Sequence, residues 1–251
     1  NLCSEITLPT GIDKEGRDRT AVCCLSSLNL EKYDEWKDDK NIISDVMRFL
    51  DNVLSDFINR APDQFADAKY SAEKERSVGL GVMGFHSYLQ KNNIPLESVM
   101  SKVWNKKIFK HIQEQVDQSS KKLADERGAC PDAADYGFKE RFSNKTAIAP
   151  TASISVICGG ASPGVEPVAA NSYTHKTLSG SFNVRNRYLV KLLEKYKKNT
   201  DEVWSGITTN EGSVSHLDFL TDIEKDVFKT AFELDQKWII ELSGDRTPYI
   251  S

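Results

Sequence analysis

The first five residues carry three side chains that could act together on a substrate. Asn1, Cys3 and Glu5 alternate along the chain, and alternate side chains of an extended segment point to the same side. A thiol, a carboxylate and an amide would then face one small volume, where the carboxylate could act as a general base and the amide could hold a hydroxyl group. The spacing equally allows a loop with solvated polar side chains, so both interpretations stay open.

Two adjacent thiols follow at Cys23 and Cys24. Neighbouring cysteines rarely bridge one another, because their Cβ atoms point apart and disulfide geometry is narrow. Either one of them pairs with a thiol elsewhere, or both are core residues, since buried cysteine is common. The sequence has 5 cysteines, an odd number in a chain that is not small, which favours a reducing compartment and predicts a cytoplasmic protein.

The run Pro150-Thr151-Ala152-Ser153-Ile154-Ser155 follows a predicted strand. A strand that ends in this way and opens a helix aims unpaired backbone amides and two hydroxyl groups at one point, which makes an anion site. The alternative is an ordinary helix N-cap formed by a threonine or serine. Taken alone, the run favours the ordinary cap.

The spacing Gly79-x-Gly81-x-x-Gly84 matches a dinucleotide-binding loop. That loop must follow a buried strand, and the preceding residues 71–77 are too charged for one. We therefore reject a nucleotide cofactor here and expect glycines that let a helix or loop pack closely against a neighbour.

Hydrophobic spacing predicts helices over 31–58, 102–127, 187–198 and 221–242 and short strands over 21–25 and 145–149. Gly128 is expected to end the second helix, and a Thr221-x-x-Glu224 capping box to open the last. Helices that alternate with short strands indicate an α/β fold with mostly parallel strands. Without a repeat or a low-complexity linker, we predict a single domain over 1–251.

Composition excludes several classes of function. The chain is 39% hydrophobic and 28% charged, as in a soluble protein with a core, and its net charge of −4 argues against nucleic acid as a partner. No run of about 18 apolar residues predicts a membrane span, and the first ten residues do not resemble a signal peptide. No cysteine or histidine spacing predicts a metal site.

Taken together, the motifs resemble the large (alpha) subunit of ribonucleotide reductase. Asn1-Leu2-Cys3-Ser4-Glu5-Ile6 resembles the active-site finger loop of that family, and Cys23-Cys24-Leu25-Ser26 to Asn29-Leu30 resembles the strand that carries one redox cysteine. Ala149-Pro150-Thr151-Ala152-Ser153 matches the phosphate loop, and Gly164-Val165-Glu166-Pro167 follows it as in the family. Residues 79–84 and 245–250 also match. The resemblance covers nearly the whole chain, and several motifs in order make it more specific than any one of them.

The resemblance implies the C-terminal part of a ten-stranded α/β barrel, with the finger loop at its N-terminus. Cys3 would become a thiyl radical that abstracts the ribose 3′ hydrogen, Glu5 would take the 3′ hydroxyl proton, and Asn1 would bind the ribose hydroxyl groups. Cys23 would supply one of two reducing thiols. The substrate phosphates would be bound by Thr151, Ala152, Ser153 and Ile154.

The resemblance also implies partners. Pro-Thr-Ala-Ser resembles class I enzymes, which reduce ribonucleoside diphosphates and receive their radical from a metal-containing small (beta) subunit. Cobalamin-dependent class II relatives, the alternative, tend to have Pro-Thr-Gly-Thr. No cofactor is expected to bind the chain directly, and thioredoxin or glutaredoxin would be the external reductant.

Several parts of the family are expected to lie outside these 251 residues. They are the regulatory N-terminal region, the second redox cysteine, the radical-relay tyrosines and the C-terminal redox tail, so we expect the chain to work with the missing large-subunit segments. One alternative is a non-catalytic assembly fragment of a split reductase, and another is a redox sensor that uses Cys23 and Cys24. The intact set of Asn1, Cys3, Glu5 and Cys23 favours the enzyme, because a relic would be free to lose any of them.

Overall fold

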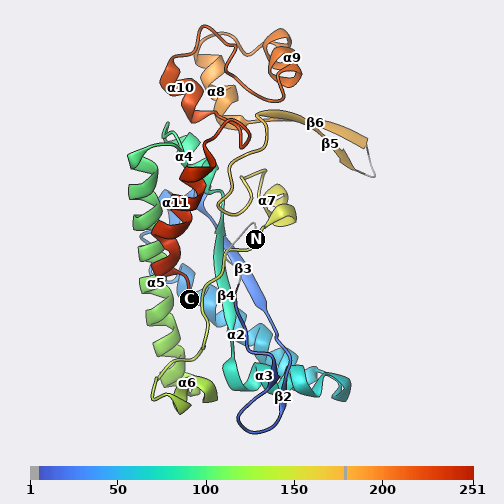
Figure 1. Cartoon of the computed structure of the whole chain (residues 1–251), viewed down its shortest axis with the longest axis vertical. Helices are drawn as coiled ribbons and strands as arrows, with labels where there is room; N and C mark the ends of the chain where they lie inside the picture. The colour runs from blue at the N-terminus through green and yellow to red at the C-terminus, as the bar shows by residue number, and fades with distance from the viewer. Residues whose placement is uncertain (1–5, 178–179) are drawn as a thin grey trace.

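Two parallel strands run through the middle of the molecule (Figure 1). The computed structural model describes residues 6–177 and 180–251. Strand β3 (Cys24–Asn29) pairs with β4 (Val78–Met83), with Cys24 beside Val78 and Asn29 beside Met83. The strand predicted over 21–25 therefore begins three residues later, because its pairing with β4 sets its limits.

The parallel pair is joined by a helical crossover, which is the usual connection between parallel strands. It contains η1 (Leu30–Lys32), α1 (Tyr33–Trp36), α2 (Ile42–Arg60), η2 (Asp63–Phe65) and α3 (Ala66–Glu75). The helix predicted over 31–58 is thus divided, and its long part is α2. The segment before β4, left without a predicted helix, forms α3.

Gly79 and Gly81 lie inside β4, where every residue is buried. A Cβ on Gly79 would lie 2.8 Å from the Ala147 Cβ, and one on Gly81 would overlap the Ala147 carbonyl oxygen. The expected close packing is confirmed, but the glycines belong to a strand rather than to a helix or loop.

The segment predicted as a strand over 145–149 lies along the other side of β4. It forms only a parallel bridge between Leu80 and Thr146, with hydrogen bonds from the Leu80 N–H to the Lys145 carbonyl and from the Ala147 N–H to the Leu80 carbonyl. The ladder ends there, shortly before Pro150, which has no N–H to donate. The strand prediction was therefore too long.

Two antiparallel hairpins were not predicted. Strand β1 (Gly11–Ile12) pairs with β2 (Asp18–Arg19), and β5 (Ser172–Thr177) pairs with β6 (Gly180–Arg185) and extends from the body of the molecule (Figure 1). The α/β class is confirmed, while the mostly parallel arrangement holds only for β3, β4 and the bridged segment among the described residues.

The larger hydrophobic core packs helices against the parallel pair. After β4 come α4 (Phe85–Lys91), α5 (Val99–Arg127) and α6 (Pro131–Asp135). Helix α5 ends at Gly128, whose φ of +89° suits glycine, as predicted. Helix α11 (Gln236–Arg246) lies along α5, and η3 (Thr247–Tyr249) follows it (Figure 1).

A second, smaller core lies among α8 (Arg187–Lys195), α9 (Asp201–Thr209) and α10 (Asp222–Val227). The predicted capping box of Thr221 and Glu224 is present, but the single helix over 221–242 was wrong, because α10 ends at Val227. Phe228 is buried in the smaller core and Leu234 in the larger one. The chain leaves the helix at Phe228, and α11 begins anew after Asp235, whose side chain caps it by accepting from the Lys237 N–H. The prediction of a single domain over 1–251 stays a prediction.

Asp51 of α2 forms a buried charge cluster that joins this helix to the ends of α3 and α5 and to the segment after α6. Its carboxylate is 0% exposed and pairs with Arg76 (Nη2–Oδ1, 2.7 Å), Arg127 (Nη1–Oδ2, 2.6 Å) and Arg141 (Nε–Oδ1, 2.9 Å). We expect Asp51→Ala to lower the free energy of unfolding by about 3–5 kcal/mol, because three guanidinium groups lose their buried carboxylate. Denaturant unfolding measures this loss.

Asp56 provides the matched control on the same helix, since its pair with Arg60 is largely exposed. Asp56→Ala should change the free energy of unfolding by less than about 1 kcal/mol. Equal effects of the two substitutions would show that the Asp51 cluster is not a structural anchor.

Glu75, at the end of α3, predicts a pH dependence of stability. Its carboxyl group is 1% exposed, and burial raises its pKa from the ordinary value of 4.5 to about 7. The pKa of this carboxyl group is higher in the folded protein than in the unfolded chain. The protonated Glu75 therefore stabilises the fold fully below pH 4.5, and this stabilisation is lost as the pH rises through 7. The loss is about 3 kcal/mol. Glu75→Gln should therefore be more favourable, relative to the wild type, at pH 8 than at pH 5. Parallel stability curves for the two proteins would contradict this assignment.

Candidate active site

The predicted phosphate loop opens a short helix, α7 (Ala152–Ile157). Thr151 occupies the N-cap position with φ 55° and ψ 24°, a left-handed conformation that a β-branched residue rarely adopts. Strained backbone of this kind concentrates at functional sites, where surrounding contacts hold it in place.

The Thr151 side chain turns away from the helix that it precedes. Its Oγ1 accepts a hydrogen bond from the Gly164 N–H at 2.7 Å, and it makes no capping bond to α7. The ordinary N-cap favoured by the isolated run is therefore wrong. The first-turn amides of Ala152, Ser153 and Ile154 have no helical acceptor, as at any helix start, and these three residues are exposed.

The loop after α7 folds back on the helix and fixes Thr151. The Ala161 N–H donates to the Ser155 carbonyl at 3.1 Å, and Gly164 adopts φ +47°. A Cβ on Gly164 would lie 3.0 Å from the Ala149 carbonyl oxygen, so this close approach favours glycine. The motif that follows the phosphate run thus serves to orient its threonine.

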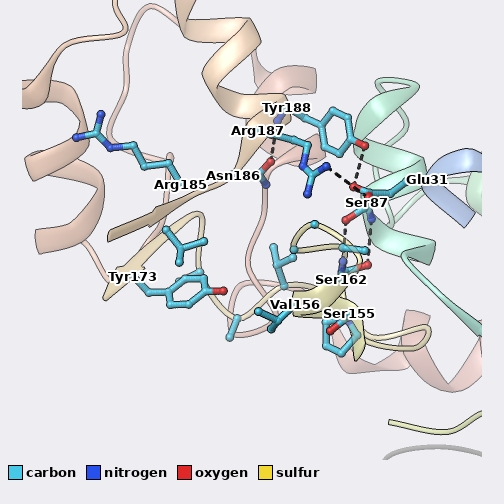
Figure 2. Close-up of a pocket in the computed structure, with 18 of the residues that line it drawn as sticks. Glu31, Ser87, Ser155, Val156, Ser162, Tyr173, Arg185, Asn186, Arg187 and Tyr188 are labelled. Atoms are coloured by element: carbon cyan, nitrogen blue, oxygen red, sulfur yellow. Dashed lines mark hydrogen bonds and ion pairs between the residues drawn. The ribbon is translucent and has the colours of Figure 1, made fainter. Parts of the chain in front are cut away.

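A cavity of about 720 Å³ lies beside α7 (Figure 2). Ala152, Ser155 and Val156 form one wall, and the β5–β6 hairpin and the start of α8 form another. Glu31 follows β3 and Ser87 follows β4, so the cavity lies beyond the carboxyl ends of the parallel strands. Ligand sites of open α/β sheets are usual at this end.

Charged and hydroxyl groups line one side of this cavity. The Tyr188 hydroxyl donates to Glu31 Oε1 at 2.8 Å, and Arg187 Nη1 lies 3.7 Å from Glu31 Oε2, as Figure 2 shows. Burial, together with the hydrogen bond to Glu31, raises the pKa of the Tyr188 hydroxyl. Sequence reasoning missed these residues. One signal was available: Asn186, whose side chain accepts from the Tyr188 N–H as the N-cap of α8.

The predicted cysteines differ in environment. Asn1, Cys3 and Glu5 lie outside the described residues. Cys23 is exposed, directly before β3, so the interpretation of both adjacent cysteines as core residues was wrong. Cys24 is half-buried, and burial raises the pKa of its thiol.

Within residues 6–177 and 180–251, no group of three histidine, cysteine, aspartate or glutamate side chains is arranged to hold a metal ion. No helix within them is both long and apolar enough to cross a membrane.

The fold and the site define a class: an α/β protein with a strained turn at Thr151, beside the carboxyl ends of two parallel strands. Comparison with known proteins makes this specific. Residues 1–140 and 132–251 match the family described as ribonucleotide reductase, barrel domain. The chain belongs to this family, which confirms the resemblance and the partial α/β barrel.

Similar proteins match this chain over nearly its full length. It is 50% identical to the ribonucleoside-diphosphate reductase large subunit of Invertebrate iridescent virus 6, covering 99% of this chain and 26% of the relative. It is 42% identical to the putative ribonucleoside-diphosphate reductase large subunit of Frog virus 3, and the match covers 100% of this chain and 43% of that relative. The structure of the Actinobacillus ureae class Id ribonucleotide reductase alpha subunit aligns with a TM-score of 0.89 at 41% identity, covering 100% of this chain and 45% of that one. The chain thus spans less than half the length of these proteins.

Proposed function

We propose that this chain supplies the thiyl-radical cysteine and the phosphate loop of an enzyme that reduces ribonucleoside diphosphates to deoxyribonucleoside diphosphates. It would act as part of a larger reductase, since relatives named for this activity are more than twice its length. The observation that carries the proposal is the Thr151 turn. Its side chain bonds to Gly164 and leaves the first-turn amides of α7 to an anion.

The substrate phosphates would bind the amides of Ala152, Ser153 and Ile154, with the helix dipole adding a favourable field. Thr151 would act by holding this turn. Because phosphate binding fixes one end of the nucleotide, the ribose can be presented to the reactive residues in a single orientation.

The reactive residues would be those of the family's motif. A Cys3 thiyl radical would abstract the ribose 3′ hydrogen, Glu5 would take the 3′ hydroxyl proton, and Asn1 would bind the ribose hydroxyl groups. Replacement of the 2′ hydroxyl by hydrogen, with release of water, consumes two electrons. Cys23 and a second thiol would supply them by forming a disulfide.

The partners follow from the class. The similarity to a class Id alpha subunit supports a class I enzyme, in which the radical arises in a metal-containing small subunit and the chain itself binds no cofactor. The remaining large-subunit segments, and thioredoxin or glutaredoxin as reductant, would complete the system. Such a dithiol cycle suits the reducing cytoplasm.

Thr151→Val tests the phosphate loop. This change keeps the shape of the side chain but leaves the buried Gly164 N–H without its acceptor, which costs about 1–3 kcal/mol. If that loss falls on phosphate binding, KM for the diphosphate should rise roughly ten- to a hundredfold. The assay is deoxyribonucleoside diphosphate formation by the assembled reductase.

Cys158→Ser is the control, because this exposed residue lies at the other end of α7 and should leave KM unchanged. An unchanged KM for Thr151→Val would remove the phosphate loop from the proposal. Assembled wild-type enzyme that forms no deoxyribonucleoside diphosphate would overturn the proposed function itself.

A further inference from the structure

The β1–β2 hairpin lies in sequence between the two cysteines proposed to react. Twenty positions separate Cys3 from Cys23, and a flexible chain of that length has a root-mean-square end-to-end distance of roughly 25 Å. Each reacting thiol must instead approach the substrate atom that it attacks to about 3–3.5 Å. Some contacts of the segment between Cys3 and Cys23 therefore have to hold its backbone in one position.

Within the hairpin itself, apolar burial does not provide this fixation. Ile12, the hairpin's large apolar residue, is 75% exposed, whereas Arg19 is only 8% exposed. Among residues 11–20, Arg19 alone is classed as buried. The hairpin is therefore anchored by polar contacts.

Arg19 is the centre of these contacts. Its Nη2 donates to Asp132 Oδ2 of α6 at 2.5 Å, and its Nε lies 3.4 Å from Asp13 Oδ2 at the other end of the hairpin. Beside it, the Thr20 N–H donates to Ser71 Oγ of α3 at 2.8 Å. These bonds join the hairpin to two helices of the body.

Peripheral contacts support the same attachment. The Tyr70 hydroxyl of α3 lies 2.9 Å from Asp13 Oδ2 and 2.8 Å from Glu15 Oε2. The Arg17 guanidinium lies over the Tyr70 ring, 3.6 Å from its centroid. The tip of the hairpin thus also rests on α3.

The charge balance makes Arg19 hard to replace. The carboxylates of Asp13 and Asp132 both contact its guanidinium group. Removing the guanidinium would leave these carboxylates facing one another with little solvent to screen them. Their repulsion would push the hairpin away from α3 and α6.

We propose that Arg19 is a positioning residue of the reductase: by clamping the hairpin to α3 and α6, it fixes where the chain enters the Cys23 strand relative to the residues upstream. This inference rests on the proposed function. Arg19 itself would touch neither substrate nor the reacting atoms.

The test uses Arg19→Met, Arg19→Lys and Asp132→Asn, with Lys14→Met as the control on the same hairpin. Lys14 is a suitable control because its side chain is 66% exposed and its pair with Asp135 lies at the surface. Amide hydrogen exchange over residues 13–20 should become about tenfold faster or more in Arg19→Met, with a smaller effect in Asp132→Asn and none in Lys14→Met. If Arg19→Met does not fold, the exchange rates of Asp132→Asn test the proposal in its place.

Steady-state kinetics distinguish a misplaced reactive segment in folded enzyme from a mere loss of folded enzyme. For correctly folded enzyme, kcat should fall by about 100-fold in Arg19→Met with an unchanged KM, because the phosphate loop is not altered. Arg19→Lys, which keeps the charge, should restore part of kcat. Exchange rates and kcat equal to wild type in both Arg19→Met and Asp132→Asn would overturn this inference alone. A wild-type enzyme without diphosphate reduction would overturn the proposed function and this inference with it.

Discussion

Cys3→Ser should leave no measurable reduction of ribonucleoside diphosphates by the assembled reductase. A sulfur radical can abstract a hydrogen atom from carbon, and no closed-shell side chain can do so. Serine keeps the size and polarity of the residue but cannot be converted to a comparably accessible radical, because its O–H bond is much stronger than a thiol S–H bond. The measurement is deoxyribonucleoside diphosphate formed per enzyme, in the presence of a radical-generating small subunit.

Cys158→Ser again serves as a control, since it removes an exposed thiol at the end of α7 that has no proposed role. It should retain wild-type activity, which shows that thiol loss as such is tolerated. Wild-type activity in Cys3→Ser would remove Cys3 from the mechanism.

The adjacent cysteines should respond in opposite ways to the same substitution. Cys23→Ser is expected to stop repeated turnover, because a serine cannot pass electrons by forming a disulfide. Cys24→Ser should retain activity within a few-fold of wild type. Cys24 is half-buried and burial raises the pKa of its thiol, so at neutral pH little of it is the reactive thiolate.

This pair is a stringent test because only one position along the chain distinguishes the two variants. Turnover is measured with a dithiol reductant and, separately, with thioredoxin. Activity lost in Cys24→Ser and kept in Cys23→Ser would reverse the assignment of the redox thiol.

Local signals in the sequence predicted those elements that depend on local interactions. The Thr221–Glu224 capping box and the end of α5 at Gly128 are both present, since each is decided within one turn of helix. The break between α10 and α11 could not be predicted in this way. The chain passes there from one core to another, with Phe228 buried in the smaller core and Leu234 in the larger one, and this is a property of the tertiary packing.

The candidate site shows the same division. The order of the motifs pointed to the family, and the family comparison confirmed that resemblance, yet the run around Thr151 taken alone favoured an ordinary helix cap. The Thr151 side chain instead accepts a hydrogen bond from the N–H of Gly164, thirteen residues away, and local propensity does not encode such a contact. The Arg19 clamp was missed for a similar reason, since its partner Asp132 is distant in sequence and a charged residue is normally expected at the surface.

The most direct test of the central claim is an experimental structure of this chain within its assembled subunit, bound to a ribonucleoside diphosphate. We expect the phosphates to accept hydrogen bonds from the amides of Ala152, Ser153 and Ile154. We also expect the Cys3 Sγ to face the ribose 3′ carbon at roughly van der Waals distance, the separation required for reaction. Phosphates bound elsewhere, or a Cys3 Sγ far from the ribose, would contradict a single active site formed by the finger loop and α7.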